Sequence, residues 1–329
     1  MCGLVDGPEN PQRPNVALRS LQESSSFQPI ARVVLTMQIL GHHRILELLP
    51  KLRAQTFLFT GPEGVGRRTV ARWFAYGLNC ERGFPPCGQC GSCRLEPHPD
   101  LLEIAPESET KTGRKARVPQ IRLEQIAPRE GEVEQNLLDW IATYPRFKAK
   151  TAIIDGAHWL GEPAANALLK VLEEPPGFAR LILVAPSREL VLPTLVSRSL
   201  ELGFAPLPEA LLQTLTRDPE VLAFAQGAPG RVRWALEHPA EFGKLTSRTQ
   251  GVLEALRAGP AQTLEALKLL SEMEGALPYL GRQLGKILEV GSPAYQEALE
   301  ALSRAQDALS AYVSEDLVQT WLALKLGRL

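Results

Sequence analysis

The sequence predicts an α/β fold followed by a helical C-terminal region. Three observations support this prediction. A glycine-rich loop lies between a short apolar run and a helical pattern, within residues 56–79. A second apolar run, at residues 150–155, ends in a carboxylate. From about residue 244 onward, leucine and alanine recur at helical spacing.

The first predicted strand is Thr56–Thr60, a short run rich in strand-forming residues. The first predicted helix is Thr69–Leu78, because apolar residues recur there every four positions before Asn79. We therefore expect a buried strand, then the glycine loop, then a helix. This order is the one that a phosphate-binding loop requires.

The glycine loop has the spacing of a Walker A motif. In such a loop, backbone N–H groups surround phosphate, a lysine contacts the terminal phosphates, and the next Ser or Thr binds Mg²⁺. Here Arg67 occupies the lysine position and Arg68 the hydroxyl position. Arg68 would place a cation where Mg²⁺ needs an oxygen ligand, so we expect no hydrolysis. The alternative is an ordinary glycine turn. The candidate nucleotide-site residues of the loop are Gly61, Gly64, Gly66, Arg67, Arg68 and Thr69.

Composition limits the possible function classes. The 329 residues predict about two or three domains. The formal net charge is −1, from 36 Lys+Arg and 37 Asp+Glu, so the chain lacks the positive field of a nucleic-acid binder that acts alone. It has no uninterrupted apolar run of ~18 residues and no signal-peptide pattern. We expect a cytoplasmic protein with no membrane partner and with reduced cysteines.

Residues 1–36 differ from the rest of the chain, because they are rich in proline and serine and show little periodicity. We expect this leader to be poorly ordered. Met37 directly precedes the first organised sequence, which suggests that translation begins there. The intact mass of the native protein tests that hypothesis.

Four cysteines form a C-x6-C-x2-C-x2-C cluster: Cys80, Cys87, Cys90 and Cys93. Gly88 and Gly91 provide turns that let the thiolates converge, and four thiolates suit tetrahedral Zn²⁺. Disulfides and an iron–sulfur cluster are the alternatives, although the usual bacterial iron–sulfur run has its fourth cysteine downstream, before a proline. Four ligands leave no open position, so we expect a structural zinc. Cys2 is interpreted as incidental.

The run Lys150–Asp155 has the form of a Walker B strand, whose Asp155 would hold Mg²⁺ through water. An ATPase of this type needs a carboxylate at the next position, and this chain has Gly156, which cannot act as a general base. His158 could be considered as a substitute, but a lone histidine is more often a packing or capping residue. The alternative is an ordinary buried strand that ends in an aspartate.

Three further elements follow. An amphipathic helix over 163–174 ends at Pro175-Pro176, and 181–186 is a buried strand. Residues 195–199 are predicted to open another strand.

These residues resemble a known family. Ala165–Pro176, Ser197-Arg198-Ser199 and the four-cysteine insert after a phosphate loop together resemble the bacterial DNA polymerase III clamp-loader family. The similarity covers roughly residues 37–329 and is strongest from 57 to 204.

Three positions favour one branch of that family. Arg67, Arg68 and Gly156 resemble the delta-prime subunits more than the ATPase (gamma/tau) subunits. The resemblance implies an AAA+ core over 37–204, with a parallel sheet, helices on both faces and a zinc-binding insert at 80–93. It also implies a small helical lid over 205–243 and an α-helical collar over 244–329, through which subunits form a ring.

The resemblance also assigns roles to two arginines. Arg198 inherits the position of an arginine finger that enters the ATP site of a neighbouring subunit. Ser199 stands where the family usually has cysteine. Arg231, in the run Gly227–Arg233, matches a nucleotide-sensing arginine of the lid. The alternative for Arg198 is an ordinary surface arginine.

The implied partners are the gamma/tau ATPase subunits and the delta subunit. Through the complex, the chain would also contact the sliding clamp and primer-template DNA. The implied cofactor is a structural Zn²⁺, and ATP binding by this chain is doubtful, because both Walker motifs depart from the pattern.

The C-terminal region is predicted to contain several helices, separated near Gly259-Pro260, Gly291-Ser292-Pro293 and Ser314. The sequence does not separate leucines of an internal core from leucines of a subunit interface. The apolar stripes are Leu299, Leu302, Ala305, Leu309 and Tyr312, then Leu317, Trp321 and Leu324.

Three functions fit the sequence. The first is a non-hydrolysing clamp-loader subunit that completes a neighbour's ATPase site. The second is an active clamp-loader ATPase with an unusual Arg-Arg loop. The third is a zinc-dependent nucleic-acid-binding protein, which the net charge and the lack of interleaved aromatic residues near the cysteines disfavour.

Overall fold

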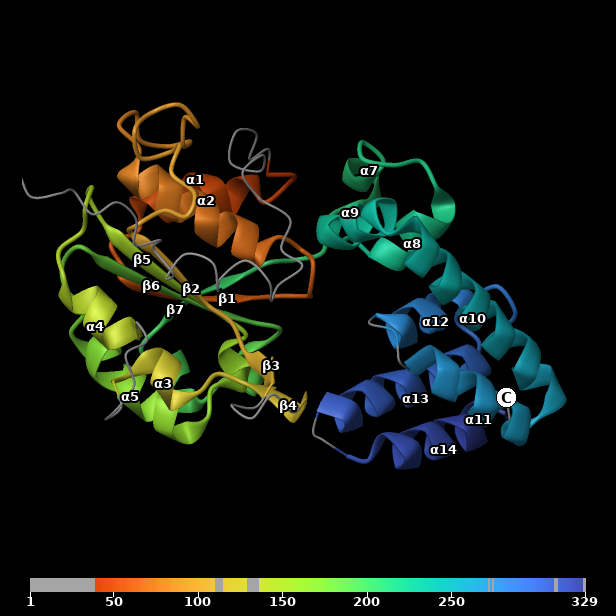
Figure 1. The fold of residues 1–329 in the computed structure, drawn as a ribbon. Helices are drawn as coiled ribbons and strands as arrows, with labels where there is room; N and C mark the ends of the chain where they lie inside the picture. Colours follow the sequence, from red (N-terminus) through yellow and green to blue (C-terminus); the bar gives the residue numbers. More distant parts are fainter. Residues whose placement is uncertain are drawn as a thin grey trace, which may run out of the picture.

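The computed structural model describes residues 39–109, 115–128, 136–271, 273, 275–310 and 313–327. The leader at 1–36, the proposed start at Met37 and Tyr312 lie outside these residues. In Figure 1 an α/β region and a helical region lie next to each other, and the chain passes from the first to the second after the last strand of the sheet.

A five-stranded sheet, in the order β2-β5-β6-β1-β7, forms the centre of the α/β region. Every pairing in this sheet is parallel, so each connection must cross from one end of the sheet to the other. The predicted α/β fold with a parallel sheet is confirmed. The strands are β1 (Thr56–Thr60), β2 (Leu101–Ile104), β5 (Lys150–Asp155), β6 (Ala179–Ala185) and β7 (Leu200–Gly203).

Helices cover both faces of this sheet, as predicted (Figure 1). Phe57 and Phe59 of β1 point into a core with α2, whereas Leu58 points into the opposite core with α5. This alternation follows from the two-residue period of a strand. The helices of this region are α1 (His43–Leu48), α2 (Arg67–Asn79), α3 (Leu123–Ile126), α4 (Leu137–Ala142), α5 (Glu162–Glu173) and α6 (Pro193–Val196).

A separate two-stranded antiparallel ribbon pairs β3 (Glu107–Glu109) with β4 (Lys115–Gln120). Short 3₁₀ helices cover Leu49–Lys51, Ala157–Trp159 and Arg188–Leu190.

The prediction that residues 195–199 open a strand is wrong. Leu195 and Val196 belong to α6, a turn follows, and β7 begins only at Leu200. Pro193 explains the difference, because a proline in the first turn favours a helix start. The Val196 N–H then donates to the Leu192 carbonyl at 3.1 Å.

The helical region shares one continuous hydrophobic core, which extends from Leu207 to Leu326. The predicted breaks at Gly259-Pro260, at 291–293 and at Ser314 are confirmed, since each lies between two helices. The predicted domain boundary between lid and collar, at 243/244, lies within one helix, α10. The division into these two domains stays a prediction. The helices are α7 (Glu209–Leu212), α8 (Pro219–Ala225), α9 (Pro229–Glu237), α10 (Pro239–Ala258), α11 (Pro260–Ser271), α12 (Ala276–Leu284), α13 (Pro293–Ser310) and α14 (Glu315–Leu326).

The buried face of α14 differs from the predicted stripe. Leu317 and Leu324 are 65% and 46% exposed, whereas Val318 and Leu322 are buried. Both sets have helical spacing and are shifted by one residue, so the sequence alone does not decide which face of the helix is buried. Packing against α11 and α13 selects the second set. In α13, Leu302 and Ala305 of the stripe are buried within the chain, whereas Leu299 is 39% exposed.

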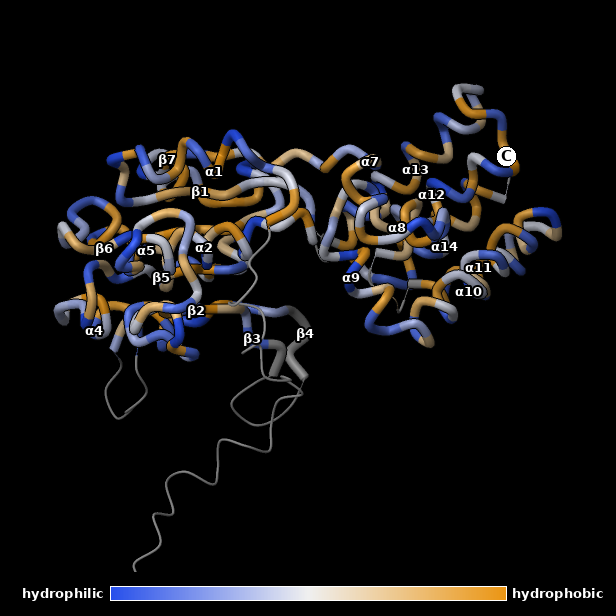
Figure 2. Tube along the Cα trace, turned by 90° about the horizontal axis from the view of Figure 1, so that it is seen from above, coloured by the Kyte–Doolittle hydropathy of each residue, from blue (hydrophilic) through white to orange (hydrophobic). Residues whose placement is uncertain are grey.

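Hydropathy along the chain follows this packing. In Figure 2, β1 and β6 are mostly hydrophobic, and the helices α10 and α11 alternate between hydrophobic and hydrophilic segments. Within the described residues, no helix combines the length and the apolar character that a membrane crossing needs.

Candidate nucleotide site and metal centre

The glycine loop connects the end of β1 to the start of α2. Gly61, Gly64 and Gly66 have φ values of 143°, 75° and 110°, which residues with a side chain rarely adopt. A Cβ atom at Gly61 would lie 2.2 Å from the Phe204 carbonyl oxygen, so this position also has no room for a side chain. The backbone thus has the strand, loop and helix order of a phosphate-binding loop.

Arg67 does not extend freely into the loop. Its Nη1 donates a hydrogen bond to the carbonyl of Ala185, at the end of β6. Burial lowers the pKa of Arg67, and the carboxylates of Asp155 and Glu63 oppose that shift. The cation in the lysine position is therefore already bound to the protein, while Thr69 is exposed.

Arg68 lies between two carboxylates from neighbouring strands. Its Nη2 is 2.6 Å from Glu103 Oε2, and its Nη1 is 3.6 Å from Asp155 Oδ2. Burial raises the pKa of Asp155, although Arg68 and Arg67 oppose this shift. A guanidinium thus provides the positive charge beside the Walker B aspartate. These residues do not fit Mg²⁺, because the cation position is occupied and the hydroxyl ligand is missing.

The position after Asp155 is also unsuited to catalysis. Gly156 has φ 89°, and a Cβ atom there would lie 2.8 Å from Trp159 Cδ1. The ring of His158 packs against that of Trp159 in a tilted arrangement, with centroids 4.8 Å apart and an interplanar angle of 40°. Burial, together with the nearby Arg67, lowers the pKa of His158 to about 4. His158 is therefore neutral near pH 7 and a weak base, which agrees with a packing role.

Helix α9 contacts the loop directly. The Gly230 N–H donates to the Gly64 carbonyl at 2.8 Å, and a Cβ atom at Gly230 would lie 2.9 Å from the same oxygen. The side chain of Arg231 packs beside Gly64, since its Cγ would lie 3.3 Å from a Cβ atom built there.

A cavity of about 520 Å³ lies between the loop and α9. Arg233 lines this cavity, and Arg231 does not. Sequence reasoning missed Arg233, because the direction of a side chain on α9 depends on how the helix packs. The rest of the lining includes Ile39, Leu40, Glu63, Arg67, Arg68, Thr69, Asp155, Leu215, Leu236 and Glu237.

An ion-pair network extends from the loop along one face of α2. Arg72 lies 3.0 Å from Glu103 and 3.0 Å from Glu96, and the Tyr76 hydroxyl donates to Glu96 at 2.8 Å. Sequence reasoning missed these residues. The four-residue spacing of Arg68, Arg72 and Tyr76 is the signal that could have placed them on one helix face.

The four cysteines converge as predicted. The sulfur atoms of Cys80, Cys87, Cys90 and Cys93 all lie within 4.8 Å of one another. Backbone N–H groups of Cys87 and Cys90 point at the sulfurs of Cys80 and Cys87, at 3.4 Å and 3.3 Å. Although burial opposes the shift, hydrogen bonds from backbone N–H groups lower the pKa of Cys90 to about 6. The group could hold a metal ion, and four thiolates are the ligand set of a structural zinc site.

Contacts from the core hold the cysteine segment in place. The Tyr76 hydroxyl oxygen also lies 3.0 Å from the Leu95 carbonyl oxygen, and Lys148 Nζ donates to the Cys80 carbonyl at 2.6 Å. Ser92 Oγ lies 2.9 Å from His98 Nε2 in the buried interior of the segment.

Arg198 lies apart from the glycine loop. It lies two residues before β7, whereas Gly61 directly follows β1, and Phe57 pairs with Leu200 in the parallel register of these strands. The two residues therefore lie at opposite ends of β1, which spans roughly 13 Å at 3.3 Å per residue. Arg198 Nη2 is instead 2.6 Å from Glu173 Oε1, at the end of α5. The fold does not bring Arg198 to the loop of its own chain.

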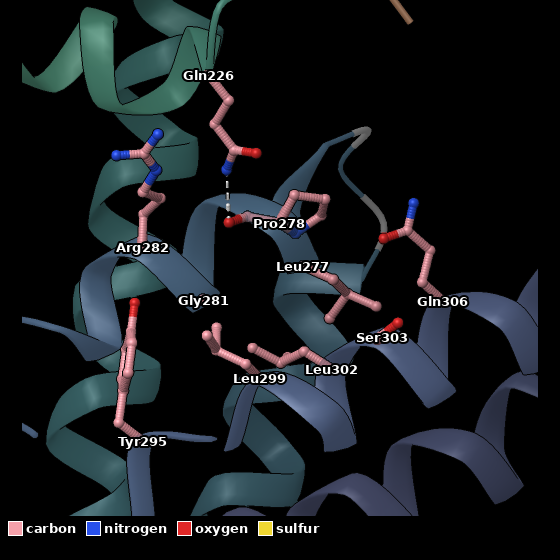
Figure 3. Close-up of a pocket in the computed structure, with 10 residues that line it drawn as sticks. All are labelled: Gln226, Leu277, Pro278, Gly281, Arg282, Tyr295, Leu299, Leu302, Ser303 and Gln306. Atoms are coloured by element: carbon pink, nitrogen blue, oxygen red, sulfur yellow. Dashed lines mark hydrogen bonds between the residues drawn. The ribbon is translucent and has the colours of Figure 1, made fainter. Parts of the chain in front are cut away.

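A second cavity, of about 310 Å³, lies in the helical region between α12 and α13 (Figure 3). Gln226 reaches over it and donates to the Pro278 carbonyl at 2.7 Å. Arg282 is the only charged side chain among the described residues that line it, beside Leu277, Leu299 and Leu302. This lining does not provide the set of groups that a nucleotide site requires.

Comparisons with known proteins agree with the sequence resemblance. A family model described as "DNA polymerase III, delta subunit" matches residues 48–208. The chain is 33% identical over 199 residues to DNA polymerase III subunit tau/gamma of Haemophilus influenzae, a match that covers 55% of this chain and 26% of that protein. It is 33% identical over 192 residues to DNA polymerase III subunit delta' of Pseudomonas aeruginosa, which covers 54% of each.

Among solved structures, a DNA polymerase III gamma subunit-related protein from Thermotoga maritima aligns with a TM-score of 0.46 and 19% identity, over 86% of this chain and 99% of that one. The chain spans from about a quarter to about half of the length of the curated relatives described above. With the matching family model and these relatives, the chain belongs to the DNA polymerase III clamp-loader family.

Proposed function

We propose that this chain is a non-hydrolysing, delta-prime-type subunit of a DNA polymerase III clamp loader. It assembles in the cytoplasm with gamma/tau ATPase subunits and a delta subunit, and the complex loads the sliding clamp onto primed DNA. Arg198 serves as an arginine finger for the ATP site of a neighbouring subunit. Because the chain resembles delta' and tau/gamma relatives about equally, the choice between them depends on the glycine loop and on Gly156.

The observation that carries the proposal is the position of Arg68. Its guanidinium lies between Glu103 and Asp155, so a fixed cation stands where a hydrolysing site needs a metal. Gly156 adds a second obstacle, because its left-handed backbone and the nearby Trp159 leave no room for a catalytic carboxylate. The loop is thus retained as a structural connection between β1 and α2.

The position of Arg198 supports a role in trans. It is half-exposed and lies at the end of the sheet opposite to the loop of its own chain. An arginine at the surface is available to a phosphate that another subunit binds, where it would stabilise charge that develops on the transferred group.

The cysteine group supports a structural metal. Cys80, Cys87, Cys90 and Cys93 would hold Zn²⁺, which would connect the end of α2 to the segment that follows it. The metal supplies folding free energy to this segment and takes no part in catalysis.

The second candidate is an active gamma/tau-like ATPase. Two observations favour it: the tau/gamma relatives share 30% to 36% identity with this chain, and a cavity of about 520 Å³ remains beside the loop. Titration of the isolated full-length chain with ATP and Mg²⁺, followed by a turnover assay, separates the two candidates. We expect no steady hydrolysis.

The matched control for this assay is Asp155→Asn. If the wild-type chain hydrolyses ATP and Asp155→Asn does so more slowly, the activity belongs to the chain itself. That result would contradict the proposal. Residual hydrolysis that Asp155→Asn leaves unchanged comes from a contaminating enzyme.

A further inference from the structure

We propose that Glu173 is a positioning residue that holds Arg198 at the surface of this chain and releases it to the phosphate of a neighbouring nucleotide. The inference rests on the proposed role of Arg198 as an arginine finger. It adds a second residue, on another element, that controls when the finger is available.

The contacts of Arg198 account for all three guanidinium nitrogens. Nε and Nη2 donate to the same carboxylate oxygen of Glu173, at 2.9 Å and 2.6 Å. Nη1 donates to the Thr194 carbonyl at 3.1 Å and to Ser197 Oγ at 3.3 Å. The guanidinium is therefore directed toward Glu173, and it must give up at least one of these contacts before it can bind a phosphate through two hydrogen bonds.

The fold fixes the position of Glu173. It is the last residue of α5, directly before the turn that contains Pro175 and Pro176. The side-chain amide of Gln55 donates to the Pro176 carbonyl at 2.7 Å and to the Ala179 carbonyl at 3.3 Å, which anchors this turn to β1. Because Glu173 sits on a fixed helix end, its carboxylate holds Arg198 in a defined place.

The exposure of the pair permits release. The side chains of Arg198 and Glu173 are 35% and 52% exposed, and ion pairs at such surface positions are weak. A phosphate offers the guanidinium stronger bidentate hydrogen bonds. Glu173 cannot accompany Arg198 to that phosphate without placing two negative groups together, so binding by the neighbour must break the pair.

Glu173 should therefore raise the KM for ATP at the neighbouring site. We expect Glu173→Gln, in a clamp loader reconstituted with the full-length chain, to lower the KM for ATP about two- to fivefold, a range set by the weakness of surface ion pairs. The kcat should stay within about twofold, because Arg198 itself is unchanged. A purely structural effect would not separate KM from kcat in this way.

Glu174→Gln is the matched control. Glu174 is the next exposed carboxylate, and the described contacts of Arg198 do not include it. This variant removes the same charge one residue away and should leave KM unchanged. Thermal unfolding of both variants verifies that each is folded.

The double variant Arg198→Ala with Glu173→Gln gives the decisive comparison. If Glu173 acts through Arg198, Glu173→Gln has no further effect once Arg198 is absent. An unchanged or higher KM in the single variant Glu173→Gln would overturn the holding role. If Arg198→Ala leaves the ATPase of the complex unchanged, the proposed function itself fails, whatever Glu173 does.

Discussion

Arg68 of α2 and Glu103 of β2 form a close ion pair, in which Nη2 and Oε2 are 2.6 Å apart. Glu103 also forms an ion pair with Arg72, which lies one turn further along α2. The pair thus connects the helix after the glycine loop to an edge strand of the sheet. Arg68 therefore helps to hold α2 against the sheet, and its loss should lower the stability of the fold.

We predict that Arg68→Ala lowers the free energy of unfolding by about 1–2 kcal/mol, between the values for exposed and buried ion pairs. The side chains of Arg68 and Glu103 are 40% and 19% exposed, which places the pair between these limits. Urea unfolding measures the change. Arg304→Ala is the control, because its pair with Glu300 is exposed on both sides and should contribute less than about 0.5 kcal/mol. Equal losses in both variants would contradict the prediction.

The sequence predicted local elements well where one pattern dominates. The strands at 56–60 and 150–155 match β1 and β5, because short apolar runs in an α/β chain have few alternatives. The convergence of the cysteines was also predictable, since the cluster spans only residues 80–93 and contains its own turns.

Contacts between distant segments were not predictable from the same patterns. The partner of Arg68 is Glu103, and no local rule pairs a helix residue with a particular carboxylate on a later strand. The rotation of α14 and the direction of Arg233 on α9 depend on tertiary packing as well. The segment before β7 became a short helix because Pro193 favours a helix start over a strand.

The cysteine group gives the second prediction. Cys93→Ser should abolish binding of the proposed zinc and lower the free energy of unfolding by more than about 3 kcal/mol, because metal binding contributes directly to folding. Cys93 is 2% exposed, so the substitution also buries a polar hydroxyl in place of the sulfur. Elemental analysis and thermal unfolding measure the two effects.

Cys2→Ser is the matched control for the cysteine variant, since it removes the one cysteine that lies outside the cluster. It should leave zinc content and stability unchanged. A chain that unfolds at the same temperature with and without a chelator would argue against a structural metal.

The pKa of His158 gives the third prediction, which concerns pH. Burial and Arg67 lower this pKa from 6.5 to about 4. The unfolded chain therefore binds a proton between these values while the folded chain does not. Folding stability rises with pH across this window and is lost as pH falls from about 6.5 to about 4, by up to about 3 kcal/mol for this residue.

His158→Gln removes that contribution, because glutamine does not titrate. Urea unfolding at several pH values should show a shallower pH dependence between pH 6.5 and pH 4 for this variant. His43→Gln is the control, because His43 is exposed. If His158→Gln and His43→Gln had the same pH dependence, burial of His158 would not be the cause.

A pair of glycines gives the last prediction, which concerns the contact between α9 and the loop. A Cβ atom at Gly230 would lie 2.9 Å from the Gly64 carbonyl oxygen and 3.0 Å from the Gly64 Cα. These are backbone atoms that cannot rotate away, so Gly230→Ala must move α9 from the loop. We expect it to lower the free energy of unfolding by about 1–2 kcal/mol, despite the better helix propensity of alanine.

Gly243 is the matched control, because it lies within α10 and a Cβ atom there would meet no atom within 4 Å. Gly243→Ala should therefore raise the free energy of unfolding by about 0.5–1 kcal/mol, through helix propensity alone. The two substitutions are chemically identical, so opposite signs in urea unfolding would isolate the contact between Gly230 and Gly64. If both variants were more stable than the wild type, Gly230 of α9 would not be in close contact with the glycine loop in solution.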